Sequence, residues 1–380
     1  MTSDLGNWPP ARFGETKTNQ QDTLSVIKGG LRSITICVKY ASADMMNAHD
    51  SLSLALANAE DVVSRLDERL DLHVGRGGLV SRLDYEEASA WAWNSGLSAS
   101  TEDLLLHHES MDVRTPTQDL RSAYGLLLAR RKAMFSTGDL LSPDGAHWLA
   151  GLRKSPPADR PDEARAPSPP QDHDGLDLVA DVVAQVCAIE KRSTEDAEAA
   201  LAEWFAILLS PGTRRPALLQ AALALEAWAL IKPYPRAPYV GPVLVAAWLR
   251  HVKRIPSHLI TIERGLRAYR RLRHAHPGLP SSERVANWLN IIAEAAAVTR
   301  AEFQRLELQR FRLSRLAKGR RSHSHMDEAI KLVIETPLVT IPMMAKALKI
   351  TQTSSARILG VLGPSLTEIT GRSRFRAWRA

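Results

Sequence analysis

The chain has 380 residues, of which 44% are hydrophobic and 24% charged, a balance that is ordinary for soluble globular protein and large enough for two or three domains. The apolar runs over 216–231 and 242–249 are interrupted by a charge or too short to span a bilayer, so we expect no membrane partner. The net charge of +7 is uneven, because 24 of the 49 Lys and Arg residues but only 9 of the 42 Asp and Glu residues lie from His251 onward. This excess fits a polyanionic partner for the C-terminal part.

The N-terminal residues 1–30 are polar and unpatterned, which predicts a flexible tail, and they contain no apolar segment of a signal peptide. Cys37 and Cys187 lie among Ile and Val, so we interpret them as reduced core residues of a cytoplasmic protein. Leu and Ala dominate and strand-like alternation is scarce, which predicts a mainly α-helical fold.

Helical patterning runs from about Leu52 to Arg153, with breaks near Gly75–Gly78 and at Thr115-Pro116. Residues 154–175 are rich in proline, which lacks an amide donor and clashes with the preceding turn, so they predict a long loop. Further helices are predicted over 176–190, 194–209, 215–230, 243–253, 258–273, 281–297 and 300–318. Together these segments predict a helical body over residues 31–318.

A proline-rich segment separates the helices over 215–230 and 243–253. It reads Lys232-Pro233-Tyr234-Pro235-Arg236-Ala237-Pro238-Tyr239-Val240. With the apolar helix before it, this segment resembles the Fic (filamentation/DOC) family, whose active-site loop reads His-Pro-Phe-x-Asp/Glu-Gly-Asn-Gly-Arg. The resemblance covers roughly residues 80–310 and implies a Fic-like helical bundle.

The resemblance also implies that the Fic chemistry is lost. The Pro-aromatic frame survives, but Lys232 stands at the general-base histidine and Arg236 at the acidic metal ligand. Ala237 and Pro238 replace the Gly-Asn pair, and Val240 replaces the phosphate-binding arginine. Nucleotidyl transfer needs a base of near-neutral pKa, a carboxylate-held cation and free backbone amides, so we expect no adenylyl transfer here. Asn94 falls where the glutamate that restrains active Fic enzymes would be.

We expect no cofactor and no metal ion. The histidine pairs His107-His108, His274-x-His276 and His323-x-His325 are not accompanied by Cys or carboxylate clusters at ligand spacing.

Many Fic proteins carry a C-terminal winged helix, and the layout of this chain also resembles uncharacterised helix-turn-helix proteins of rhizobial plasmids.

The C-terminal residues predict a basic hinge over 319–325 and a winged helix-turn-helix over 326–380. Ile341–Leu348 is the predicted first helix of the pair, Lys349-Ile350 the turn, and Thr351 the cap of the next helix. Ala356, Leu359 and Leu362 are predicted to pack inward. The residues predicted to face DNA from this helix and its turn are Lys349, Thr351, Gln352, Thr353, Ser354 and Arg357.

Two short strands around a Gly-Arg turn are predicted to form the wing. Arg372, Arg374, Arg376 and Arg379 are its predicted phosphate contacts, with Arg374 and Arg376 on one strand face and Phe375 on the other. The leading hypothesis is a DNA-binding transcriptional regulator whose partner is double-stranded DNA and whose body serves dimerisation or sensing. The alternatives are a nucleotide-dependent transferase that uses the remodelled loop, and an adaptor that binds a protein partner.

Overall fold

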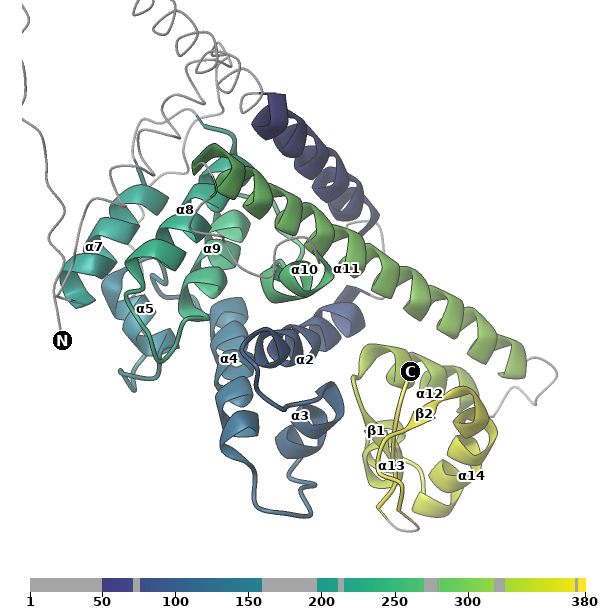
Figure 1. Ribbon diagram of the computed structural model, residues 1–380. Coiled ribbons are helices and arrows are strands. Elements are labelled where there is room, and N and C mark those ends of the chain that lie inside the picture. Colours follow the sequence, from purple (N-terminus) through teal and green to yellow (C-terminus); the bar gives the residue numbers. More distant parts are fainter. Residues whose placement is uncertain are drawn as a thin grey trace, which may run out of the picture. The chain divides into compact units, whose positions relative to one another are not determined.

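The computed structural model of the chain (Figure 1) describes residues 50–70, 76–158, 197–210, 215–269, 279, 281–317, 325–372 and 375–380. All of these belong to one compact unit, His49–Ala380. Some predictions fall outside the described residues: the N-terminal tail, both cysteines, the helix over 176–190, residues 159–175 of the proline-rich loop, residues 319–324 of the hinge, and Arg374.

The described part of the body is built from helices, which confirms the predicted fold class. A helix over 50–70 is followed by α2 (Arg76–Asn94), α3 (Thr101–His108), α4 (Gln118–Phe135), α5 (Pro143–Leu149), α7 (Ala197–Leu208), α8 (Ala217–Ile231), α9 (Val240–His251), α10 (Ile262–Ala268) and α11 (Ser281–Ala317). Local chemistry explains several of the starts. Ser100, Thr117 and Ser142 each accept a hydrogen bond from a backbone N–H in the first turn of the helix that follows.

Helix α8 is a central element of the body because it is apolar on almost every side. All of its residues from Leu218 to Trp228 are buried. Glu226 is fully buried as well, and its carboxylate accepts hydrogen bonds from Arg284 Nε at 2.6 Å and Trp288 Nε1 at 2.9 Å. Both partners lie on α11, so a buried ion pair fixes α8 against α11.

Helix α11 is one continuous helix of 37 residues, whereas the sequence predicts two helices that end and begin near residue 298. The buried Thr299 continues the helix, because its hydroxyl donates to the carbonyl of Ala295 at 2.7 Å. Helix α9 also begins three residues earlier than predicted. Pro242 lies in its first turn, where a missing amide donor costs nothing.

The C-terminal domain begins with α12 (Met326–Glu335), after which β1 (Val339–Thr340), α13 (Ile341–Leu348) and α14 (Gln352–Leu362) follow. A 3-10 turn, Gly363–Ser365, leads to β2 (Thr367–Glu368) and β3 (Ala377–Arg379). The strands form an antiparallel sheet in the order β1-β3-β2, with Val339 opposite Trp378 and Thr367 opposite Arg379. This is the winged helix-turn-helix that the sequence predicts, with β1 as an additional strand.

Candidate nucleic-acid interface

The turn between α13 and α14 follows from local residue chemistry, and the sequence predicts both helix boundaries correctly. Lys349 ends α13 in a left-handed conformation, φ 54°, which reverses the chain. The N–H of Ile350 then donates to the carbonyl of Ala345 at 3.0 Å, which also accepts the N–H of Lys349, and these two bonds close the helix end. The hydroxyl of Thr351 accepts the N–H of Ser354 at 3.2 Å and so caps α14.

The buried face of α14 is formed by Ser355, Leu359 and Leu362. The Ser355 hydroxyl donates to the carbonyl of Ile341 at 2.9 Å, which fixes α14 against the start of α13. This corrects the prediction that Ala356 packs inward, since Ala356 is exposed. The spacing of 4 and then 3 residues keeps the buried side chains on one face of a 3.6-residue helix.

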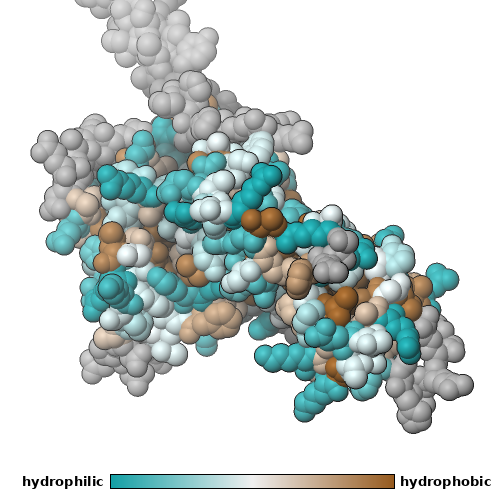
Figure 2. Space-filling model, turned by 90° about the horizontal axis from the view of Figure 1, so that it is seen from below, coloured by the Kyte–Doolittle hydropathy of each residue, from teal (hydrophilic) through white to brown (hydrophobic). Residues whose placement is uncertain are grey.

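The first turn of α14 presents the predicted base-reading side chains to solvent. Gln352, Thr353 and Arg357 are exposed, and none of their side chains forms a hydrogen bond or ion pair with another described residue. Ser354 is partly buried, and its hydroxyl accepts from that of Thr351 at 3.0 Å. On the face shown in Figure 2, hydrophilic side chains project from the right-hand side, where the C-terminal domain lies. Three of the predicted side chains are therefore available to a ligand.

The arginines of the wing point in different directions. Arg376 is exposed, pairs with Glu368, and lies with its guanidinium 5.0 Å from the ring centroid of Trp378. Arg379 instead forms a 2.6 Å ion pair with Glu102 of α3. Arg379 therefore helps to hold the domain to the body, and a phosphate would have to compete with Glu102 for it.

The strand alternation predicted for the wing does not extend to Phe375. This residue is 79% exposed and has a φ of 55°, outside the range of a regular strand. The predicted partner of Arg376 on the same face, Arg374, lies outside the described residues. Arg372 is half-buried, and its Nη2 donates to the carbonyl of Met111 in the body at 3.4 Å.

Arg82 of α2 binds the C-terminal end of α12. Its side chain is buried, and its guanidinium donates to the carbonyls of Val333, Ile334 and Thr336 at 2.8, 2.5 and 2.6 Å, and to that of Gly78 at 2.8 Å. A helix leaves its last carbonyls without partners, and a cation at that end is also favoured by the helix dipole. Burial lowers the pKa of Arg82 to about 10, so the group stays charged at neutral pH.

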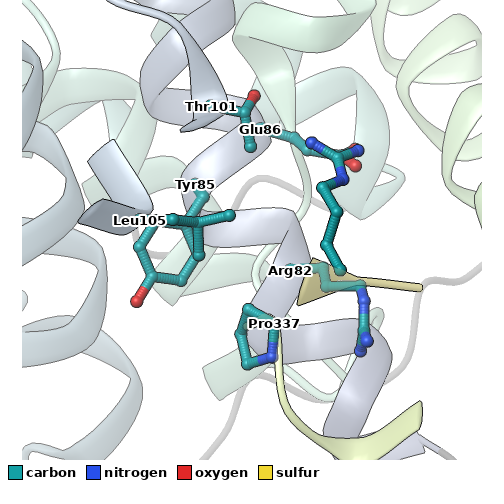
Figure 3. Close-up of a pocket in the computed structure, with 7 residues that line it drawn as sticks. Arg82, Tyr85, Glu86, Thr101, Leu105 and Pro337 are labelled. Carbon is teal, nitrogen blue, oxygen red and sulfur yellow. The ribbon is translucent and has the colours of Figure 1, made fainter. Parts of the chain in front are cut away.

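Gly78 lets α2 approach α12 closely. A Cβ atom at this position would lie 2.3 Å from the carbonyl oxygen of Ile334 and 2.7 Å from Cα of Glu335, both backbone atoms. Figure 3 shows Arg82 and Pro337 beside a small hollow that is lined by α2, α3 and the C-terminal domain. This hollow of about 10 Å³ has room for about one water molecule.

Helix α11 makes a second contact with the C-terminal domain. Arg305 pairs with Glu302 at 2.7 Å and donates to the carbonyl of Ala380 at 3.0 Å, and the Gln309 amide donates to the carbonyl of Ser365. With Arg82 and Arg379, these bonds attach the domain through α12, the chain end and the wing. They leave the first turn of α14 exposed.

The loop that resembles the Fic active site is closed by its own hydrogen bonds. Lys232 ends α8 in a left-handed conformation and is exposed, as is Arg236. The N–H of Ala237 donates to the carbonyl of Tyr234, and the N–H of Val240 to that of Ala237, each at 3.1 Å. These two amides are therefore engaged within the loop, as are the carbonyls that accept them.

Aromatic packing fixes the same loop. Trp228 Nε1 donates to the carbonyl of Pro238 at 2.8 Å, and Tyr239 meets the ring of Trp91 edge-on at 5.4 Å. Tyr234 and Val240 are buried, as is Pro233, and burial raises the pKa of Tyr234 to about 12. Among the described residues, no group of three or more His, Cys, Asp or Glu side chains is placed to hold a metal ion.

Asn94, at the end of α2, bonds to α10. Its Nδ2 donates to the Glu263 carboxylate at 2.7 Å and to the Glu263 carbonyl at 3.0 Å. Glu87 accepts the N–H groups of Glu263 and Arg264 at 2.9 and 3.0 Å. Burial and the neighbouring Glu87 raise the pKa of Glu263 to about 7. Asn94 thus serves to join two helices of the body.

The sequence and structure of the chain are similar to those of known proteins. The model of the family described as "Protein of unknown function (DUF1612)" matches residues 192–318, and that of the "HTH DNA binding domain" matches residues 326–379. The uncharacterized protein y4cF of Sinorhizobium fredii (strain NBRC 101917 / NGR234) is 32% identical over 358 residues, 83% of this chain and 93% of that protein. The chain belongs to the family of that protein.

A solved structure with a similar layout is that of a Fic family protein from Desulfovibrio desulfuricans G20. It covers 87% of this chain and 95% of its own, at 14% identity and a TM-score of 0.41. A likeness this distant carries no argument about chemistry.

In the part of this chain that the structure describes, no helix is long and apolar enough to cross a membrane.

Three residues that shape the interface were not predicted from the sequence: Gly78, Arg82 and Ser355. The spacing of Ser355 to Leu359 and Leu362 was a usable signal, because it matches a helical face. For Arg82 no sequence signal exists, since its partners lie about 250 residues away and are backbone carbonyls.

Proposed function

We propose that the C-terminal domain binds double-stranded DNA, with the first turn of α14 in the major groove. The observation that carries this proposal is the exposed, unpaired set Gln352, Thr353 and Arg357 at the start of a capped helix in a domain that matches a DNA-binding family. Gln pairs with two edge atoms of adenine and Arg with two of guanine. Such side chains at the start of the second helix are those that read bases in this motif.

Phosphate contacts would come from the cations around this helix. Lys346 of α13 and Lys349, which follows that helix, are exposed, and neither forms an ion pair with a described residue. Arg376 supplies a cation on the wing, although Glu368 neutralises part of its charge. These contacts fix the register of the protein on the duplex and carry no sequence information.

We propose further that the body is a regulatory support for this domain and not an adenylyltransferase. The closed loop supports this, because two of its amides are engaged and Tyr234 and Val240 are packed away from solvent. Incubation with labelled nucleotides and a cell lysate tests it. Transfer of label by the wild type that is lost in Lys232→Ala would contradict the proposal.

The test of DNA binding starts from the full chain and a pool of random duplexes. After selection of a preferred site, fluorescence anisotropy measures its affinity for wild type and variants. Arg357→Ala should lose about 1–3 kcal/mol on the selected site and much less on unrelated DNA. Lys349→Ala should weaken binding to every sequence alike.

Arg236→Ala is the matched control, since Arg236 is an exposed arginine on the loop of the body. Failure of the wild type to bind any duplex at low salt would refute the proposal. In the same assay, protection of two related half-sites would support a homodimer, and a single half-site would count against it.

A further inference from the structure

The connection between α3 and α4 lies against the wing. The Nη2 atom of Arg372, in the wing, donates to the carbonyl of Met111 at 3.4 Å. Between them is a hollow of about 410 Å³, lined among others by Met111, Val113, Arg114, Thr115 and Arg372. In Figure 1 this connection lies at the lower edge of the view beneath α3 and α4, with the C-terminal domain to its right, and the hydrogen bond joins it to the wing.

The charges around this hollow leave an arginine without a partner. Arg114 is exposed and forms no hydrogen bond or ion pair with any described residue. The nearby carboxylates are already engaged, since Asp112 bonds to His107 Nδ1 at 2.7 Å and Asp103 accepts the Ser100 hydroxyl at 2.7 Å. Arg114 and Arg372 thus line one hollow and come from two different domains.

A guanidinium is well matched to a phosphate, because its planar set of donors can bind two oxygens at once. A duplex carries a phosphate about every 3.4 Å along each strand, so DNA that passes the wing presents further phosphates beyond it. The body places Arg114 there, beside the wing that the C-terminal domain supplies. Val113, next to it, is 71% exposed, so no part of the described chain covers this loop.

We propose that the α3–α4 connection is a second DNA-contacting element, in which Arg114 binds a backbone phosphate next to the wing. This inference rests on the proposed DNA binding of the C-terminal domain. It makes the body part of the DNA-binding surface and extends the footprint on the side of the wing. Arg114 adds affinity for every sequence and no preference among them.

The test compares the full-length wild type with Arg114→Ala and Arg114→Lys on one selected duplex over a range of salt concentrations. Arg114→Ala should reduce the slope of log affinity against log salt by about 1. Arg114→Lys should restore most of the slope, since lysine keeps the charge. Phosphate-ethylation interference should lose one cluster of sites on the wing side in Arg114→Ala and keep those that face α14.

The control is Arg236→Ala, an exposed arginine of the body outside this hollow, which should leave slope and interference pattern unchanged. Unfolding midpoints of all variants should match the wild type, because Arg114 has no described partner to lose. If the wild type binds DNA and Arg114→Ala keeps the wild-type slope, the inference is wrong while the proposed function stands. If the wild type binds no DNA, the proposed function itself is wrong.

Discussion

The contact between α2 and α12 allows a sharp prediction with a built-in control. In Gly78→Ala the new methyl group meets the backbone of Ile334 and Glu335 at 2.3 and 2.7 Å, and backbone atoms cannot rotate away as a side chain would. In Gly77→Ala the new methyl meets nothing within 4 Å. Both substitutions raise helix propensity by about the same 1 kcal/mol, so their difference isolates the contact.

The size of the effect follows from what separation would break. Arg82 would lose three hydrogen bonds to the carbonyls of α12, each worth about 1.5–3 kcal/mol for a charged donor. Against this, the guanidinium regains water. That regained hydration is already included in these values, so complete separation would cost about 4.5–9 kcal/mol. The methyl group loosens the contact without separating it fully, so we expect a loss of about 3 kcal/mol, about that of one such bond.

Hydrogen exchange of the full chain, followed by mass spectrometry, measures this difference. The free energy of opening of α12 should fall by about 3 kcal/mol in Gly78→Ala relative to Gly77→Ala, while α8 in the body keeps its protection. Equal exchange of α12 in the two variants would show that the close approach of α2 does not stabilise the domain. That result would refute the reasoning from Gly78 and Arg82.

Two further substitutions test the body. The pKa of Glu263 is raised to about 7 from 4.5, so its contribution to stability is full below about pH 4.5 and is lost as pH rises through about 7. Glu263→Gln should therefore match the wild type in urea unfolding near pH 4 and be more stable by up to about 3 kcal/mol at pH 8; an equal difference at both pH values would contradict this. Gly241→Ala would place a methyl 2.2 Å from the ring of Trp228, which Pro238 holds by a hydrogen bond. We expect it to lower the thermal midpoint and cost about 1–3 kcal/mol by overpacking, and an unchanged midpoint would show that the ring moves freely.

Local chemistry made the C-terminal domain predictable. The capping threonine at 351 and the break at Lys349 define the ends of α13 and α14, and each acts through neighbours a few residues away. The same reasoning misplaced Ala356, because a spacing of three residues was extended where the helix required four. It also predicted two helices where α11 is continuous, although Thr299 extends the helix through its hydrogen bond to Ala295.

The roles of the wing arginines could not be predicted from the sequence, because some of their partners are distant in the chain. Arg376 and Arg379 are three positions apart, just before and at the end of β3, and look alike in the sequence. One faces solvent and pairs within the wing, and the other pairs with Glu102, 277 residues away. Which of the two is free to bind phosphate depends on the docking of the domain on the body, and no local pattern encodes that docking.

The uneven charge of the chain has a second explanation besides DNA. The acidic excess lies before residue 251 and the basic excess after it, and the fold brings members of the two halves together as ion pairs. Such pairs are Arg254 with Glu60, Arg264 with Glu86, Arg284 with Glu226, and Arg379 with Glu102. These C-terminal arginines neutralise acidic side chains of the body and are paired within the fold. The salt dependence of DNA binding should therefore report a few exposed cations around α14, the wing and Arg114, and fall well short of the excess counted along the sequence.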